Sequence, residues 1–155
     1  MPTPLNAGKT QSGERLYFLS LARLNEWPSE LRVYSKYLRL FIACDAGRLR
    51  ASEVRDFTAL AIRQGLVDLS VWGPSCCKNF HVPFVDAAPL SRNDDSDLII
   101  ANCNQCSLPM AVKFFIKFGH VARKYRRHCK SLLFVSIHNS VWAKSIRRSL
   151  RELRS

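Results

Sequence analysis

Short apolar runs alternate with amphipathic segments along this chain. The runs at residues 38–44, 66–72, 98–101 and 132–137 are apolar over most of their length and end at polar or glycine-containing turns, which is typical of buried strands. Residues 16–24 are also apolar and predict either a further strand or a short helix. The pattern therefore predicts about four strands separated by longer connections.

Three of the remaining segments place apolar residues at helical spacing. Ser52 favours the start of a helix that Gly65 ends. Ser107 predicts the start of a long helix that reaches Arg127, with apolar positions on one face and cationic positions roughly opposite. A last helix is expected after the turn at residues 138–140.

Strands that alternate with helices, and that are apolar on both faces, indicate a mainly parallel sheet covered on both sides. We therefore expect a small three-layer, doubly wound α/β structure with a sheet of about four strands. Residues 1–14 are rich in polar residues, proline and glycine and predict a flexible arm. Residues 15–155 are expected to form a single α/β domain with strongly basic C-terminal helices.

The amino-acid composition is that of an ordinary globular protein. With 155 residues, 47% hydrophobic and 23% charged, the chain fits one globular domain and excludes extensive disorder. Its first residues lack the apolar segment of a signal peptide, and no apolar run approaches the ~18 residues of a membrane span. A cytoplasmic protein without membrane contact is expected. Its six cysteines are then expected as thiols or metal ligands rather than disulfides.

Positive charge is concentrated in the last third of the chain. Residues 1–100 carry 12 basic and 11 acidic side chains, whereas residues 101–155 carry 12 basic and 1 acidic, so that part holds +11 of the total +12. This asymmetry predicts an anionic partner, either nucleic acid or an acidic protein, the latter as a subunit of a larger complex. The expected anion-binding residues lie on the two C-terminal helices: Lys113, Lys117, Lys124, Arg127, Lys144, Arg147, Arg148 and Arg151. No helix-turn-helix, zinc-finger or aromatic stacking motif indicates sequence-specific recognition.

Unusual side chains follow several of the expected strands. Because ligands of open α/β sheets bind outside the carboxyl ends of the strands, these side chains predict a ligand pocket at that edge. Its expected members are Asp45, Trp72, Cys76, Asn102, Cys103 and His138. Each also has a structural explanation: Asp45 could cap the next helix, for example, and His138 could satisfy a backbone carbonyl. No Gly-x-Gly-x-x-Gly follows an expected strand, so a dinucleotide site is not expected.

Two alternatives place cysteine chemistry at the same edge. Cys106 lies at the expected helix start, where the helix dipole favours a nucleophile; Cys103 is a second candidate, with His138 or His81 as base and Asp45 nearby. The other alternative is zinc, because Cys103 and Cys106 have ligand spacing. The candidate ligands are Cys76, Cys77, His81, Cys103 and Cys106. A second Cys-x-x-Cys is missing from the sequence, which counts against zinc. The favoured hypothesis is a small cytosolic α/β binding module that engages an anionic partner through its basic C-terminal helices and a ligand or partner at the strand edge, with neither cofactor nor catalysis required.

Several motifs together resemble a known family. They are Trp72-Gly-Pro-Ser-Cys76, Asp86-Ala-Ala88, the acidic residues 94–97, Ser107-Leu108 with Phe114-Phe115, and the strand at 134–137. Over about residues 37–137 the chain resembles an uncharacterised bacterial α/β domain family, a domain of unknown function with a Trp-Gly-x-x-Cys loop. The family places Thr-Trp-His where this chain has Ala101-Asn-Cys103, and acidic residues where it has Gln105-Cys106. The resemblance implies an α/β fold and a role for residues 72–76, and it implies no activity.

Overall fold

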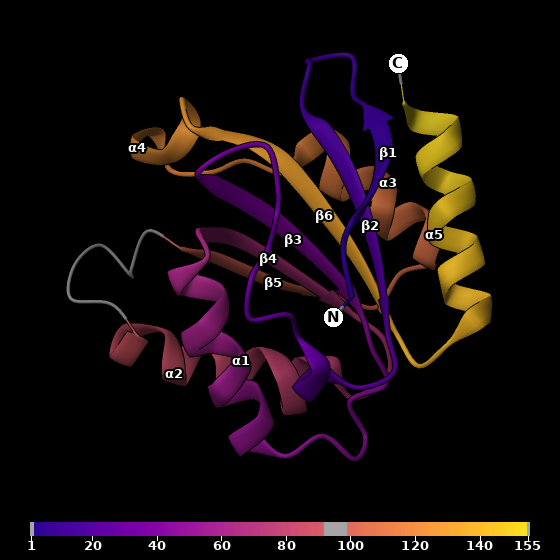
Figure 1. Cartoon of the computed structure of the whole chain (residues 1–155). Coiled ribbons are helices and arrows are strands. Elements are labelled where there is room, and N and C mark those ends of the chain that lie inside the picture. The colour runs from indigo at the N-terminus through magenta and orange to yellow at the C-terminus, as the bar shows by residue number, and fades with distance from the viewer. Residues whose placement is uncertain (1, 92–98, 155) are drawn as a thin grey trace.

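The computed structural model describes residues 2–91 and 99–154, which form one mostly parallel six-stranded sheet in the order β1-β2-β6-β3-β4-β5 (Figure 1). Five strands run parallel, and only β1 is antiparallel to its neighbour β2. The strands are β1 (Leu5–Lys9), β2 (Arg15–Leu21), β3 (Tyr37–Ala43), β4 (Leu66–Trp72), β5 (Ile100–Asn104) and β6 (Cys129–Ile137). The predicted α/β class is confirmed.

Helices cover both faces of the sheet. They are α1 (Ala51–Arg63), α2 (Val82–Ala87), α3 (Leu108–Phe118), α4 (Arg123–Arg126) and α5 (Ser140–Leu153), with short turns η1 (Leu24–Glu26), η2 (Cys77–His81) and η3 (Ala88–Ser91). Helices α1 and α2 lie on one face, and α3 and α5 lie side by side on the other (Figure 1). Among the described residues, no helix combines the length and apolar character that crossing a membrane requires.

The expectation of four strands is wrong because the N-terminal part of the chain joins the sheet. Residues 5–9, expected within a flexible arm, form the edge strand β1, and residues 16–21 lie in β2. Strand β1 is polar and largely exposed, so it lacks the continuous apolar pattern of a buried strand. The acidic residues 94–97 and Leu98 of the third predicted strand lie outside the described residues.

The long helix predicted from Ser107 to Arg127 is interrupted. Helix α3 ends at Phe118, and the chain is extended at Gly119 before the short α4. The guanidinium group of Arg39 in β3 donates to the carbonyl of Phe115 and lies so close to Gly119 that a β-carbon there would collide with it. A cation at a helix C-terminus is favourable, so a side chain distant in sequence ends this helix.

Two buried clusters hold the layers together. The cluster on the α1/α2 face is continuous and apolar, and in it Phe57 stacks edge-on against Phe80. The cluster on the α3/α5 face includes Phe41, Phe115 and Phe134, whose rings lie 5.5 to 5.7 Å apart. Each face of the sheet is therefore buried, which explains why its central strands are apolar throughout.

Candidate functional site

The carboxyl ends of the five parallel strands lie at one edge of the sheet, as the sequence predicts. The predicted pocket residues follow or end these strands, but their side chains lie on different faces. Trp72 packs edge-on against Trp142 of α5, at 5.1 Å between ring centroids, whereas Cys76 is fully buried in the cluster on the α1/α2 face. Sharing an edge therefore does not bring these side chains into one cavity.

Asp45 and His138, proposed from sequence as catalytic partners, each organise the turn in which they lie. The carboxylate of Asp45 accepts a hydrogen bond of 3.0 Å from the amide of Gly47 and is exposed. His138 has a positive φ of 52°, and its amide donates to the carbonyl of Leu21 at 2.8 Å. Both residues have a structural role in the turns that follow β3 and β6.

The Trp-Gly-x-x-Cys segment forms a tight loop after β4. Gly73 has a φ of 131°, and a β-carbon on it would lie 2.1 Å from the carbonyl oxygen of Cys44, so only glycine fits there. The indole nitrogen of Trp72 donates to the carbonyl of Cys106 at 2.6 Å. The loop thus ties the end of β4 to the segment that enters α3.

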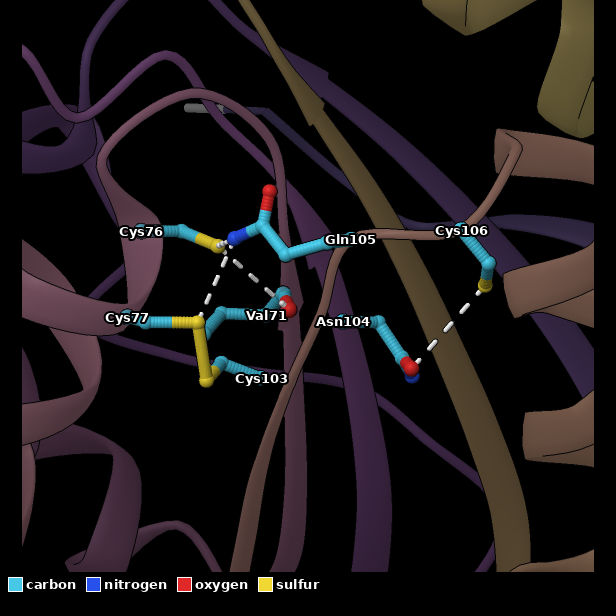
Figure 2. Close-up of a disulfide and its surroundings, with 7 residues drawn as sticks. All are labelled: Val71, Cys76, Cys77, Cys103, Asn104, Gln105 and Cys106. Atoms are coloured by element: carbon cyan, nitrogen blue, oxygen red, sulfur yellow. Dashed lines mark hydrogen bonds between the residues drawn. A yellow bond between two sulfur atoms is a disulfide. The ribbon is translucent and has the colours of Figure 1, made fainter.

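Two of the predicted thiols are joined in a disulfide. Cys77 in η2 and Cys103 in β5 are bonded, with their Cα atoms 5.4 Å apart (Figure 2). The expectation that all six cysteines are thiols or metal ligands is therefore wrong. Strands β4 and β5 are neighbours, so their carboxyl ends bring together two residues 26 positions apart.

A third sulfur lies beside this bond. The side-chain amide of Gln105 is 3.3 Å from Cys77 Sγ and 3.9 Å from Cys76 Sγ (Figure 2). Burial raises the pKa of the Cys76 thiol, which makes a poor nucleophile of it. In this state Cys103 is not a free nucleophile, and neither Cys77 nor Cys103 has a thiolate to offer to zinc.

The other cysteine predictions have mixed support. Burial raises the pKa of Cys44 and that of Cys129 to about 12, which makes both thiols inert. Cys106 is half-buried before α3, with its sulfur 3.9 Å from Asn104 Oδ1, and its role as a nucleophile stays a prediction. Nδ1 of His81 is buried without a hydrogen-bond partner. Within residues 2–91 and 99–154, no three His, Cys, Asp or Glu side chains are grouped as metal ligands.

Six of the eight predicted anion-binding residues share one side of the molecule. Lys113 and Lys117 are exposed on α3, and α5 beside it exposes the other four: Lys144, Arg147, Arg148 and Arg151. Lys124 and Arg127 do not continue this helix surface, because they lie in and just after α4, beyond the break at Gly119. We call the six exposed cations of α3 and α5 the basic face.

A cavity of about 200 Å³ lies between β1 and α5, at the margin of the basic face. It is lined by Arg147 and Arg151 of α5, by Arg154 just after the end of that helix, and by Leu5, Asn6, Ala7, Phe18 and Leu150. Among the described residues, none of the three guanidinium groups forms an ion pair with a carboxylate. Sequence reasoning missed the contribution of Asn6 because it treated the N-terminal residues as an arm.

A second cavity, of about 240 Å³, lies between α3 and the outer strands β4 and β5. Its polar lining comprises Asp68, Ser70, Asn102, Asn104 and His120, and its aromatic lining comprises Phe114, Phe115 and Phe118. The sequence prediction included only Asn102 and Cys103 of this cavity. Polar residues at alternate positions of two strands, 68 and 70 and then 102 and 104, were the signal that could have found it.

Asp68, which lines the second cavity, forms a buried ion pair with Arg39. Arg39 Nε donates to Asp68 Oδ2 at 2.8 Å, and its guanidinium group also lies 3.6 Å from Glu14 and over the ring of Phe115. Burial raises the pKa of Asp68, and the charge and hydrogen bond of Arg39 oppose this shift only in part.

Comparison of the chain with protein-family models, with curated proteins and with solved structures found no match. The resemblance to the uncharacterised bacterial family therefore stays a prediction, and the function has to be argued from the site itself.

Proposed function

We propose that this protein binds nucleic acid through the basic face and the arginine-lined cavity beside it. The observation that carries the proposal is the set Arg147, Arg151 and Arg154, three guanidinium groups around one cavity without a carboxylate partner among the described residues. Guanidinium groups bind phosphate in a bidentate manner, so three of them beside Asn6 suit a phosphodiester backbone.

The surrounding surface favours a polyanion over an acidic protein. Around the arginines, α5 exposes mainly cations, and Val141 is its one strongly exposed large apolar side chain; the exposed rings Phe114 and Phe118 belong to α3 and line the second cavity. The core of a protein–protein interface is usually apolar and aromatic, and depleted in charged residues. Nucleic acid needs no such core because most of its affinity comes from phosphate contacts and the release of counterions.

The test is binding of a fluorescent 20-nucleotide strand, and of the matching duplex, measured by anisotropy at salt concentrations from 50 to 300 mM. Log affinity is expected to fall linearly with log salt concentration. Replacing Arg147, Arg151 and Arg154 together by alanine is expected to reduce this slope by about 2 to 3, because each lost phosphate contact removes about 0.7 to 0.9.

A matched control removes the same charge from the opposite side. Arg48, Arg55 and Arg63 are exposed in or before α1, and their replacement by alanine is expected to leave the slope nearly unchanged. An equal loss in both triple variants would mean that net charge alone drives binding. Retention of polyglutamate in place of either nucleic acid would overturn the proposal and favour an acidic protein partner.

The proposal takes the protein to be cytoplasmic, as its sequence predicts, although the Cys77–Cys103 disulfide is typical of an oxidising compartment. Fractionation of cells that express the tagged full chain tests this directly. Recovery of the protein outside the cytoplasm would remove cytoplasmic nucleic acid as its natural partner.

A further inference from the structure

We infer that the cavity between α3 and strands β4 and β5 binds a single unstacked nucleobase. The base can belong to a nucleic-acid strand held by the basic face, and in that case the inference rests on the proposed function. It can also belong to a free nucleotide, and in that case the inference does not need the proposed function. In both cases the recognised chemistry is a flat, uncharged ring with hydrogen-bonding edges.

The floor of the cavity has polar atoms that the protein leaves open. Asp68 and Ser70 are only 3% and 4% exposed, and both line the cavity. Asp68 uses Oδ2 for the bond from Arg39; among the described residues, neither its second oxygen nor the Ser70 hydroxyl has a protein hydrogen-bond partner. These two oxygens face the open cavity, so a ligand that donates hydrogen bonds to them would take the place of solvent there.

The wall formed by β5 adds groups that both donate and accept. Asn102 pairs in register with Ser70, and Asn104 with Trp72, so alternate residues of β5 place two carboxamides on the α3 side of the sheet. A carboxamide offers two N–H donors and a carbonyl acceptor, which matches the mixed edge of a base. His120 completes the polar lining just after the end of α3.

The opposite wall is aromatic. Phe114 and Phe118, with ring centroids 5.6 Å apart, both line the cavity, and Phe118 remains 69% exposed. Exposed aromatic rings beside hydrogen-bonding side chains are how proteins hold unstacked bases. Phe115 is fixed beneath them by contact with Arg39 and Phe41.

Charge and size favour a base over an ion. Arg39 already compensates Asp68, so the cavity presents no isolated carboxylate to a cation. At about 240 Å³ the cavity is smaller than the roughly 300–1,000 Å³ of sites for drug-sized ligands, which suits a single ring system. Lys113 and Lys117 are exposed on the same helix, where they can meet the phosphates of the bound nucleotide.

The experiment uses the full chain and 2-aminopurine, an adenine analogue whose fluorescence changes on stacking. It is offered as the free riboside, and as one central residue in an otherwise thymine strand of 12 nucleotides. A thymine strand with an abasic site at the same position measures binding without that base. We expect a change in fluorescence on binding, and tighter binding of the aminopurine strand than of the abasic strand.

Phe118→Ala and Asn102→Ala test the two walls at positions exposed enough for the variants to fold. Each is expected to weaken binding of the aminopurine strand on the order of 10-fold, the scale of one lost stacking contact for Phe118 and of lost hydrogen bonds to the base for Asn102, and to leave the abasic strand unchanged. Met110→Ala is the matched control, because Met110 is a half-exposed apolar residue of α3 that does not line the cavity.

The outcomes separate the two proposals. Equal binding of the aminopurine and abasic strands, with no response to the riboside, overturns the cavity as a base site and leaves the proposed function intact. Binding of the riboside without any strand refutes the proposed function and identifies a free nucleotide as the source of the base. A response to neither the riboside nor any strand overturns both, and a response insensitive to Phe118 and Asn102 overturns the assignment to this cavity.

Discussion

The two faces of the sheet bury similar layers of helix but differ in what they hold. On the α1/α2 face the core is continuous and apolar, and the Cys77–Cys103 disulfide packs against its edge. On the α3/α5 face the Arg39–Asp68 pair is buried next to the core. Two cavities open on this face, one between β1 and α5 and one, lined in part by Asp68, between α3 and strands β4 and β5. One face is therefore packed almost entirely with apolar side chains, whereas the other includes buried polar groups that line the cavity proposed to bind a base.

The largest effect is expected from the buried pair. Arg39→Met should lower the free energy of unfolding by about 3 to 5 kcal/mol, because it leaves Asp68 buried without its cation and removes the donor to the Phe115 carbonyl. Urea denaturation measures the change. Adding Asp68→Leu should recover most of the loss, since apolar groups can replace a buried pair. If the double variant is no more stable than the single one, the pair itself stabilises the fold and the contrast between the faces fails.

The disulfide gives the next largest effect. Replacing Cys77 and Cys103 together by serine should cost about 3 kcal/mol, because the bond closes a loop between residues 26 positions apart. The salt dependence of nucleic-acid binding should not change, since Arg147, Arg151 and Arg154 lie between β1 and α5, away from the bond. Cys106→Ser serves as the control and should cost much less. Equal unfolding midpoints with and without a reducing agent would show that the bond contributes nothing.

Alkaline pH should weaken the protein through two buried thiols. The pKa of Cys44 and that of Cys129 are raised from 9.0 to about 12, so between these values the folded state holds protons that the unfolded state has lost. Stability should therefore fall as pH rises above about 9, by about 1.4 kcal/mol per pH unit for each thiol. Denaturation at pH 7.5, 9.5 and 10.5 measures this slope. Cys44→Ala should reduce the dependence of stability on pH by the contribution of one thiol. An unchanged slope in that variant would contradict the raised pKa of Cys44.

The smallest effect is expected at the start of α5, the helix that carries the arginines. The side chain of Asn139 accepts a hydrogen bond of 2.9 Å from the amide of Trp142, so Asn139→Ala should cost about 1 kcal/mol. Thermal unfolding measures the loss. Asn139→Asp keeps an acceptor at this position and should retain most of the stability, and a comparable loss in both variants would exclude a capping role.

Elements with a local signal could be predicted from the amino-acid pattern alone. Strands β3, β4 and β6, and helices α1 and α5, lie where apolar runs and helical spacing predict them, because burial on both faces, or on one helical stripe, leaves a continuous pattern in the chain. The common edge of the strand ends followed in the same way from parallel pairing. The charge of the last third was equally evident from composition alone.

Features that depend on residues distant in sequence became visible only in the folded chain. Arg39 ends α3 at Gly119, Cys103 meets Cys77, and β1 becomes ordered by pairing with β2, although none of these segments has a local pattern that predicts the contact. The cavities arise in the same way, from side chains of separate elements. Apolar periodicity records only whether a position is buried, whereas the partner that buries it is chosen when the layers pack together.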